Sequence, residues 1–323
     1  MKIDAVITWV DGNDPAHIAK RNRYGTSAQF KNREVAGSTR YADIGEIFWC
    51  VASLNRFAPW LNKIYIVTDA QDPCLEPFLC ANFPDGHIPY EIVDHKVIFK
   101  GYEEYLPTFN SISIETMTWR IPGLSEHYIE FNDDLMLTAP VRPEDFFTED
   151  GKLICYAQCS SIPLTLLTRL LKPYKYGIRP VTTKGLHLNA ARLSGRFWLY
   201  LRLTHCQKAL VRSFFENFYI SHPDALLRNI SYRFRDAEQF SSQALMYVSL
   251  AKAGKCIIRS ASGNFFYFMP KGDQRYFDLK MEKLRCFKGP FACFNSIDQA
   301  TNKQQSELIS WIEDRLQVNF SNK

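Results

Sequence analysis

Short apolar runs alternate with segments of helical periodicity along the first 140 residues of the chain. The runs are rich in β-branched and aromatic residues, which predicts strands buried on both faces of a sheet. These predicted strands are residues 3–10, 63–68, 90–93 and 127–131. Apolar residues at helical spacing predict helices over 44–54 and over 111–119, the second with a cap at Ser111. Strands that alternate with helices predict an α/β fold with a largely parallel sheet flanked by helices.

The second half of the chain is more basic, and its pattern predicts more helix. Residues 192–202 and 210–218 mix arginines with aromatic side chains. This favours a packed helical layer whose arginines point to solvent, with a membrane-surface patch as the alternative. Residues 306–316 place apolar side chains on one helical face. We expect a single α/β domain over residues 1–300, with a helical, basic subregion at about 160–250, and a C-terminal helix within 301–323 docked on the core.

The composition is typical of a cytoplasmic globular protein. Of the 323 residues, 46% are hydrophobic and 14% aromatic, which is enough for a large core. The net charge of +5 does not by itself indicate nucleic-acid binding, and it suits an anionic substrate or membrane surface. The nine cysteines form no CxxC pair, so neither a zinc site nor a disulfide framework is predicted. The sequence shows no signal peptide and no apolar run of spanning length, so we expect a cytoplasmic protein.

Polar turns follow three of the predicted strands, and ligands gather at the carboxyl ends of strands in such sheets. The first turn contains Asp11 and Gly12. The glycine lets a ligand approach the backbone and the aspartate could bind a ribose or a metal, although strand-Asp-Gly is also an ordinary turn. The fourth strand ends in Asn132, Asp133 and Asp134. Adjacent carboxylates beside apolar residues either cap a loop in water or hold Mg²⁺ together with substrate phosphates.

Other candidate residues have structural explanations of equal or greater weight. Asp43 and Glu46 have the spacing of a helix capping box, and Asn110 lies in a stretch suited to a helix start. Arg40 precedes a predicted helix and could grip a phosphate. His187 stands alone between leucines, as core histidines often do. The chain has no P-loop, GxGxxG or GxSxG motif, which disfavours P-loop NTPases, dinucleotide enzymes and serine hydrolases.

Taken together and in order, these clusters resemble the Stealth family of sugar-phosphate transferases. That family includes bacterial capsule and exopolysaccharide hexose-1-phosphate transferases and the catalytic subunit of N-acetylglucosamine-1-phosphotransferase. The blocks that carry the resemblance are IDAVITWVDGNDP at residues 3–15; residues 40–147, with RFAPWLNKIYIVTDAQDP, LPTFNS and RIPGLSEHYIEFNDDLML; residues 187–240, ending in RFRDAEQF; and CFNSID at 293–298. Where the family commonly has Glu-Leu-Arg-Tyr-Ser, residues 46–50 read EIFWC, so one arginine of the pattern is absent.

The resemblance implies a Rossmann-like, glycosyltransferase-A-like fold and a reaction at phosphorus. A sugar-1-phosphate passes from a nucleotide sugar, with a UDP-sugar expected, to a hydroxyl of an acceptor glycan. The product is a phosphodiester of capsular or exopolysaccharide synthesis. The resemblance implies that it is made at the cytoplasmic face of the membrane. It is also compatible with peripheral association of the protein with the membrane or with the polysaccharide-assembly machinery. The alternatives are a conventional metal-dependent glycosyltransferase and a non-catalytic glycan-binding module.

The residue roles that the resemblance implies follow from the negative charge that develops in phosphoryl transfer. Asp133 and Asp134 would hold Mg²⁺ or Mn²⁺. Arg40 and Arg235 would clamp phosphoryl oxygens in a bidentate manner. The other residues expected to contact donor or acceptor are Trp9, Asp11, Gly12, Glu46, Asn110, Asn132 and Asn295.

The acceptor hydroxyl must also lose a proton to a general base. His187 is the first candidate, because the reference pKa of histidine lies near neutrality. Its position and flanking residues favour it over His205 and His222. Asp43 or Asp134 is the second candidate.

Overall fold

The structure of the chain, a computed structural model, describes residues 1–32, 35–37, 40–170 and 181–322. Its strands are β1 Ile3–Thr8, β2 Ile64–Thr68, β3 Tyr90–Asp94, β4 His127–Asn132, β5 Leu135–Leu137, β6 Leu153–Ser161, β7 Leu199–Leu203, β8 Lys208–Val211, β9 Cys256–Arg259, β10 Phe265–Phe268 and β11 Phe291–Phe294. Its α-helices are α1 Pro15–Tyr24, α2 Ser27–Lys31, α3 Glu46–Phe57, α4 Leu75–Asn82, α5 His95–Ile98, α6 Ser111–Met117, α7 Ile162–Leu170, α8 Thr183–Leu193, α9 Arg212–Ser221, α10 Pro223–Ile230, α11 Ser242–Lys252, α12 Gln274–Cys286 and α13 Asn302–Leu316.

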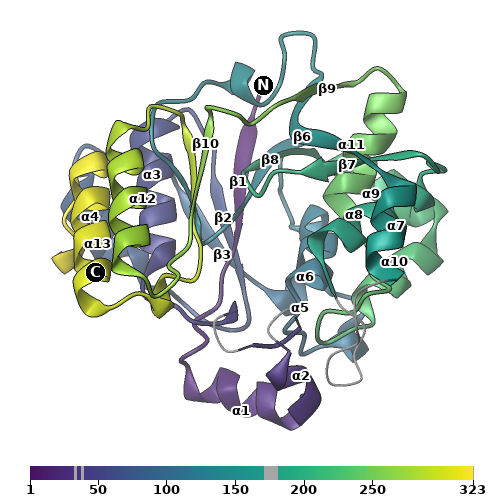
Figure 1. The fold of residues 1–323 in the computed structure, drawn as a ribbon, viewed down its shortest axis with the longest axis horizontal. Coiled ribbons are helices and arrows are strands. Elements are labelled where there is room, and N and C mark those ends of the chain that lie inside the picture. Colours follow the sequence, from purple (N-terminus) through teal and green to yellow (C-terminus); the bar gives the residue numbers. More distant parts are fainter. Residues whose placement is uncertain (33–34, 38–39, 171–180, 323) are drawn as a thin grey trace.

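The central sheet has five strands in the order β3-β2-β1-β4-β8. The first four run parallel, and β8 pairs with β4 in the antiparallel direction. Every residue of β1 and β2 is buried, because helices cover both faces of the sheet. Figure 1 shows α3, α4, α12 and α13 on one side of it and α6, α8 and α11 on the other. The predicted α/β class with a mostly parallel sheet is confirmed.

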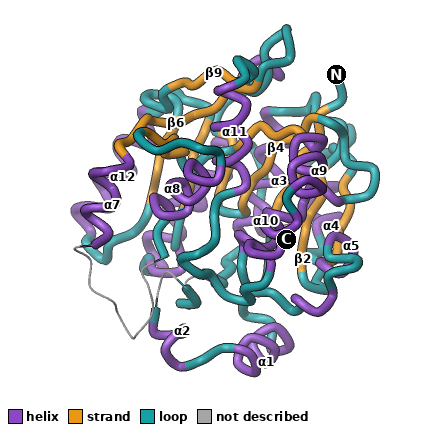
Figure 2. Tube along the Cα trace, turned by 90° about the vertical axis from the view of Figure 1, so that its right-hand side faces the viewer, coloured by secondary structure: helices purple, strands orange, loops and turns teal. Residues whose placement is uncertain are grey.

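Two small sheets extend the structure beyond the central one. Their strand orders are β10-β11-β5 and β7-β6-β9. β5 follows β4 after the Asp133–Asp134 turn and pairs antiparallel with β11, so the backbone N–H of Phe294 donates to the carbonyl of Asp134 at 2.8 Å. The turn that carries the paired aspartates is therefore held between two sheets. Figure 2 shows β6 and β9 at one end of the molecule and α1 and α2 at the opposite end.

The capping box predicted from Asp43 and Glu46 is wrong. The N-cap of α3 is Gly45, whose φ of 102° is left-handed and which has no side chain to cap the helix. Instead, Asp43 Oδ1 accepts a hydrogen bond from the Gly45 N–H at 2.8 Å, and Glu46 Oε2 accepts one from the Ile44 N–H at 2.7 Å. The two carboxylates thus shape the turn that precedes the helix and keep Glu46 inside the protein.

The predicted cap of the second helix moves by one residue. Asn110 is the N-cap of α6, and its side chain accepts from the Ile112 N–H. Ser111 is the first helical residue, so its hydroxyl is available for another partner. Near the C-terminus, the predicted helix is present as α13, which contacts α3. That residues 1–300 form one catalytic domain stays a prediction.

The helical layer predicted for the basic region is partly wrong, because strands replace part of the helix. The α8 helix ends at Leu193, Gly195 has a left-handed φ of 76°, and residues 199–203 form β7. Residues 210–218 divide between β8 and α9. Residues 171–180 of this region lie outside the described residues. Within the described ranges, every helix is too short or too polar to cross a membrane.

Candidate active site

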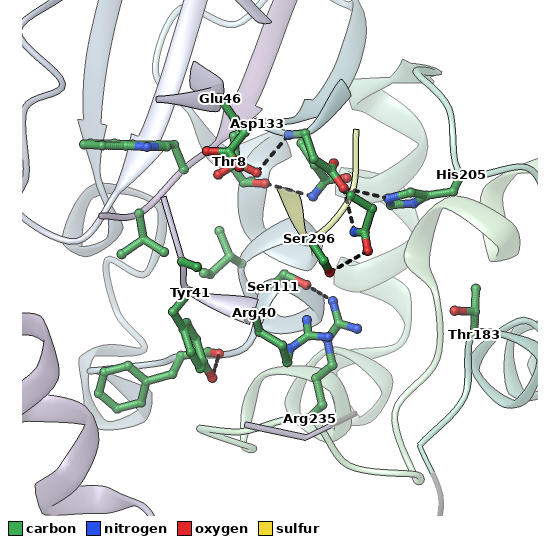
Figure 3. A pocket seen from close by; sticks show the side chains of 18 of the residues that line it. Thr8, Arg40, Tyr41, Glu46, Ser111, Asp133, Thr183, His205, Arg235 and Ser296 are labelled. Carbon is green, nitrogen blue, oxygen red and sulfur yellow. Dashed lines mark hydrogen bonds and ion pairs between the residues drawn. The ribbon is translucent and has the colours of Figure 1, made fainter. Parts of the chain in front are cut away.

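A cavity of about 610 Å³ opens where β1 and β4 end at the edge of the central sheet. Its wall includes the residues after β1, the turn after β4, the starts of α3 and α6, and the chain after β7 and β11 (Figure 3). Nine of the predicted site residues line it. They are Trp9, Arg40, Glu46, Asn132, Asp133, Asp134, His187, Arg235 and Asn295. Segments far apart in the sequence therefore meet in one cavity.

Asp134 is held by three side chains through one of its oxygens. Its Oδ2 accepts from Nδ2 of Asn295 at 3.0 Å and from the thiol of Cys293 at 3.3 Å. Nε2 of His205 lies 3.4 Å from the same oxygen. Burial would raise the pKa of Asp134, but the electrostatic interaction with His205 and these hydrogen bonds together hold that pKa well below its ordinary value. Asp134 is therefore an anion at neutral pH.

The other oxygen of Asp134 has no protein partner. Oδ1 is buried and receives no hydrogen bond from the described part of the chain. A buried acceptor left unsatisfied costs about 1–3 kcal/mol, and more when it is charged. This oxygen is consequently the natural point of attachment for a ligand with positive charge.

Two further carboxyl groups line the cavity near Asp134. Burial, followed by the charges of Asp134 and Asp43, raises the pKa of Asp133 well above its ordinary value. Burial, followed by the charge of Asp133, raises the pKa of Glu46 to about 9. A positive charge among these groups would favour their ionised forms. We call Glu46, Asp133 and Asp134 the acid wall.

The acid wall fits a hard divalent cation. Mg²⁺ and Mn²⁺ prefer oxygen ligands, and the unpartnered Oδ1 of Asp134 offers one beside Asp133. Asp134, His205 and Cys293 form another group of donor atoms, which lie within 4.8 Å of one another and would suit a softer ion. However, burial and then the charge of Asp134 raise the pKa of Cys293 well above its ordinary value, so the thiol stays protonated. The carboxylate oxygens of the acid wall therefore suit a metal ion better than this mixed group of donor atoms does.

Arginines supply positive charge to another part of the cavity. Nη2 of Arg235 donates to Oγ of Ser111 at 2.6 Å, which fixes the guanidinium at the start of α6. Arg40 also lines the cavity, and both arginines lower the pKa of Tyr41, against the larger effect of burial, which raises it. Arg40 and Arg235 therefore share one region of the site, as Figure 3 shows. Paired guanidinium groups suit phosphoryl oxygens.

Two of the histidines that line the cavity, His187 and His205, lie in different environments. His187, on α8, is almost fully buried, and burial followed by the charges of Lys208 and Arg202 lowers its pKa to about 3. Its imidazole is therefore neutral. His205 follows β7, and 46% of its side chain is exposed. In the tautomer whose Nε2–H donates to Asp134, Nδ1 of His205 carries a lone pair that can accept a proton.

Asp11 and Gly12 form the turn after β1 and lie outside the cavity lining. Asp11 Oδ1 accepts from the Asn13 N–H at 2.8 Å. A Cβ at Gly12 would stand 1.7 Å from the carbonyl oxygen of Tyr41. A ligand was expected to approach the backbone at Gly12, but the backbone of Tyr41 occupies that space. Asp11 thus forms a turn and Gly12 makes a packing contact, and the ligand contacts expected for both residues stay predictions.

Asp43 and Asn110 also lie behind the lining. Asp43 Oδ2 accepts from the indole N–H of Trp9 at 3.2 Å, so it orients a cavity residue and does not itself reach the cavity. Asn110 is fully buried, and its Nδ2 donates to Gln239 at 2.9 Å and to the carbonyl of Tyr232 at 3.0 Å. The amide group of Asn110 thus forms a structural bridge, and the substrate contact expected for this residue stays a prediction.

The sequence favoured His187 over His205 as the general base and indicated no role for Lys208. Both His205 and Lys208 line the cavity. A signal for His205 exists in the alternation of Leu199, Leu201 and Leu203. This alternation predicts a strand, and His205 then falls at a strand end, where the other site residues were found. Nζ of Lys208 lies 3.9 Å from Oε1 of Glu130, because β8 pairs with β4. No local sequence pattern indicates this pairing.

The fold and the cavity define an α/β protein whose strand-end site combines carboxylates with arginines. Two family descriptions match the chain: "Stealth protein CR1, conserved region 1" over residues 1–28 and "Stealth protein CR2, conserved region 2" over residues 40–154. The matched ranges contain the acid wall and Arg40. The chain therefore carries the two conserved regions CR1 and CR2 of Stealth proteins.

Curated relatives carry phosphotransferase names. The chain is 34% identical to the exopolysaccharide phosphotransferase SCO6021 of Streptomyces coelicolor over 253 residues, which are 77% of this chain and 43% of that protein. It is 44% identical over 150 residues to the capsular polysaccharide phosphotransferase WcwK of Streptococcus pneumoniae, covering 46% of this chain and 42% of the relative. The capsular polysaccharide phosphotransferase LcbA of Neisseria meningitidis is 40% identical over 150 residues, 46% of this chain and 39% of that protein. The chain thus spans less than half the length of these relatives in the matched regions.

Solved structures of two glycosyltransferases also align with the chain. The galactosyltransferase LgtC, in complex with donor and acceptor sugar analogues, covers 98% of this chain and 97% of its own, with a TM-score of 0.44 and 10% identity. Mouse xyloside xylosyltransferase 1 covers 91% of this chain and 98% of its own, with a TM-score of 0.39 and 11% identity.

Proposed function

We propose that the chain transfers a sugar-1-phosphate from a nucleotide sugar, with a UDP-sugar as the expected donor, to a hydroxyl of an acceptor glycan. The product would be a phosphodiester in a capsular polysaccharide or exopolysaccharide. The names of the curated relatives support this class of reaction. The observation that carries the proposal is one cavity that combines the acid wall with Arg40 and Arg235.

The two charged regions match the two needs of a diphosphate donor. A dissociating phosphoryl group spreads negative charge over its equatorial and leaving oxygens, so catalysis depends on positioning and on neutralising that charge. Arg235, fixed by Ser111, and Arg40 would hold phosphoryl oxygens through paired N–H groups. Asn132 and Asn295 line the same cavity and would add amide hydrogen bonds.

Asp134 through its free Oδ1, together with Asp133, would hold a divalent ion, with Mg²⁺ expected and Mn²⁺ as the alternative. Such an ion, when bound, neutralises charge on the leaving phosphate. The carboxyl group of Glu46 lies in the same wall and would orient neighbouring waters or a sugar hydroxyl. Trp9, oriented by Asp43, offers an aromatic surface next to this wall.

The base that takes the proton of the acceptor hydroxyl is His205 in this proposal, in place of His187. Asp134 accepts from one nitrogen of His205, which fixes the tautomer and leaves the other nitrogen free to accept a proton. The buried His187 has a pKa lowered to about 3 and would stay neutral, as a wall of the site. Attack by the activated hydroxyl forms the new P–O bond, and the bond to the nucleoside monophosphate breaks.

Identification of the released nucleotide tests the proposal. The purified chain is incubated with UDP- or GDP-sugars and an acceptor glycan, and the products are separated by mass. We expect UMP or GMP, because the sugar leaves with its phosphate. Release of UDP or GDP would indicate a conventional glycosyltransferase. Sugar binding that survives EDTA without any turnover would indicate a glycan-binding module. The cytoplasmic face of the membrane, as the place of the reaction, stays a prediction.

A further inference from the structure

The charge of the chain is distributed very unevenly. Residues 151–215 contain eleven lysines and arginines and no aspartate or glutamate. The rest of the chain carries 28 lysines and arginines against all 34 acidic residues, so it is net acidic. One continuous stretch therefore supplies more than the whole net positive charge of +5.

Part of this stretch builds a small helical layer with a core of its own. α7 packs against α8 and β7 through a cluster of buried residues that includes Ile162, Leu188 and Tyr200. The start of α7 also joins the chain before β7, because the N–H of Ile162 donates to the carbonyl of Trp198 at 2.8 Å. One face of α7 is thus packed against the protein, and the first residue of this helix is hydrogen-bonded to Trp198.

The outer face of this layer is apolar where solvent would favour polar side chains. Phe197 and Trp198 are 71% and 77% exposed, and Leu164 and Leu167 of α7 are 62% and 55% exposed. Arg192 and Arg196, which are exposed as well, precede the two aromatic residues in the sequence. We call these six residues the aromatic-basic patch. The aromatic side chains are therefore exposed to solvent together with the arginines. The sequence pattern favoured a packed layer in which the arginines point to solvent.

We propose that the aromatic-basic patch docks the protein on an anionic lipid bilayer. Tryptophan and phenylalanine are favoured at the boundary between lipid headgroups and acyl chains, where exposed leucines also lose contact with water. The two arginines of the patch are attracted by acidic lipid headgroups, and the acid-free stretch provides no repelling carboxylate of its own. A purely polyanionic partner would explain the arginines but would leave four large apolar side chains in water.

Docking through this patch would bring the cavity near the membrane surface. α8 carries His187 and the chain after β7 carries His205, and both residues line the cavity. The same two elements therefore connect the patch with the cavity wall. A glycan acceptor anchored in the bilayer would be within reach of a protein held in this way. The docking itself does not depend on which reaction the cavity performs.

Flotation with lipid vesicles tests the proposal. The purified chain is mixed with vesicles of phosphatidylcholine and phosphatidylglycerol in equal parts, or of phosphatidylcholine alone, without donor or acceptor. We expect binding to the mixed vesicles that weakens as salt is added, because salt screens the headgroup charge. The double variant Phe197→Ser/Trp198→Ser should bind at least about tenfold more weakly. Arg192→Gln and Arg196→Gln should each weaken binding about fivefold.

A matched control comes from the opposite side of the sheet. Leu279→Ser/Lys283→Gln removes one exposed apolar and one exposed basic residue from α12, and its vesicle binding should equal that of the unmodified chain. Circular dichroism and the thermal midpoint of each variant show whether the fold is retained. Patch variants that lose vesicle binding should keep their turnover on a soluble acceptor, so a failed transfer reaction cannot be mistaken for failed docking.

Three outcomes would overturn the proposal. The first is equal vesicle binding by the unmodified chain and the folded patch variants. The second is binding to a soluble sulfated polysaccharide with no binding to anionic vesicles, which would assign the patch to a polyanionic glycan. The third is a lipid-free dimer that the Phe197→Ser/Trp198→Ser variant converts to a monomer, with no vesicle binding by either form.

Discussion

Nε2 of His205 lies 3.4 Å from Oδ2 of Asp134, although 71 positions separate the two residues in the sequence. This contact links a side chain after β7 to the turn after β4. It uses one oxygen of Asp134 and leaves the other without a partner in the described part of the chain. One carboxylate can therefore orient a base and bind a cation simultaneously, which makes Asp134 the centre of the site.

His205→Ala should reduce kcat by about 10²–10⁴-fold, because the variant lacks the proposed base. The dissociation constant of the donor should change much less, since the base acts on the acceptor. Initial rates and donor titration calorimetry measure the two quantities. His187→Ala is the matched comparison in the same cavity. A greater loss of kcat in the His187 variant than in the His205 variant would return the role of base to His187.

Asp134→Asn should weaken the binding of Mn²⁺ by at least about 100-fold and remove most of the transfer activity. The amide keeps the shape of the side chain but loses the negative charge that holds the ion. Electron paramagnetic resonance of added Mn²⁺ reports the binding directly, without turnover. Asp150→Asn, at an exposed turn, provides the control. Unchanged Mn²⁺ binding in the Asp134 variant would move the metal away from the acid wall.

Arg235→Lys should lower kcat/KM for the donor by about 10–100-fold, as expected when one charge-assisted hydrogen bond is lost. Lysine keeps the charge but cannot bond a phosphoryl oxygen and Ser111 with the same fixed geometry. Arg228→Lys, on the exposed side of α10, is the control. Steady-state kinetics with the donor varied measure the effect. Equal parameters for the two variants would contradict a phosphate contact.

Glu130 should make the stability of the fold depend on pH. Burial, followed by the charge of Glu115, raises its pKa to about 8, against an ordinary value of 4.5. Between these pH values the folded state binds the proton and the unfolded state does not, so the free energy of unfolding falls as pH rises. Each pH unit in this window should cost the unmodified chain up to about 1.4 kcal/mol relative to Glu130→Gln.

Urea unfolding of both proteins at several pH values measures this difference. The free energy of unfolding of the unmodified chain, relative to that of Glu130→Gln, should be largest near the lower end of the window and should fall toward pH 8. Glu282→Gln, at an exposed position of α12, controls for the substitution itself. A constant difference across the window would mean that Glu130 titrates alike in both states.

Much of the sheet could be predicted because its strands are buried on both faces. Continuous apolar runs such as Ile3–Thr8 are a local signal, and the polar turns that follow them mark the strand ends. Asp133 and Asp134 could be found for the same reason, as charges that interrupt an apolar run. The parts of the site that depend only on local sequence were accordingly visible without a structure.

The rest of the site depends on contacts between distant segments. Cys293 and Asn295 reach Asp134 because β11 pairs with β5, and no local pattern encodes that pairing. His187 was preferred to His205 from its position and flanking residues, and neither of these shows that His205 lies next to Asp134. The turn before α3 is closed by Gly45 in a left-handed conformation. Asp43 and Glu46 have the spacing of a capping box, but they accept hydrogen bonds from backbone N–H groups of this turn instead.

The fate of the phosphate next to the sugar tests the central claim most directly. A UDP-sugar labelled with ³²P in the phosphate attached to the sugar is incubated with the purified chain, acceptor glycan and Mg²⁺. Attack at phosphorus places the label in the glycan and releases unlabelled UMP. Label that remains in released UDP, with the sugar transferred alone, would contradict the reaction proposed for this cavity.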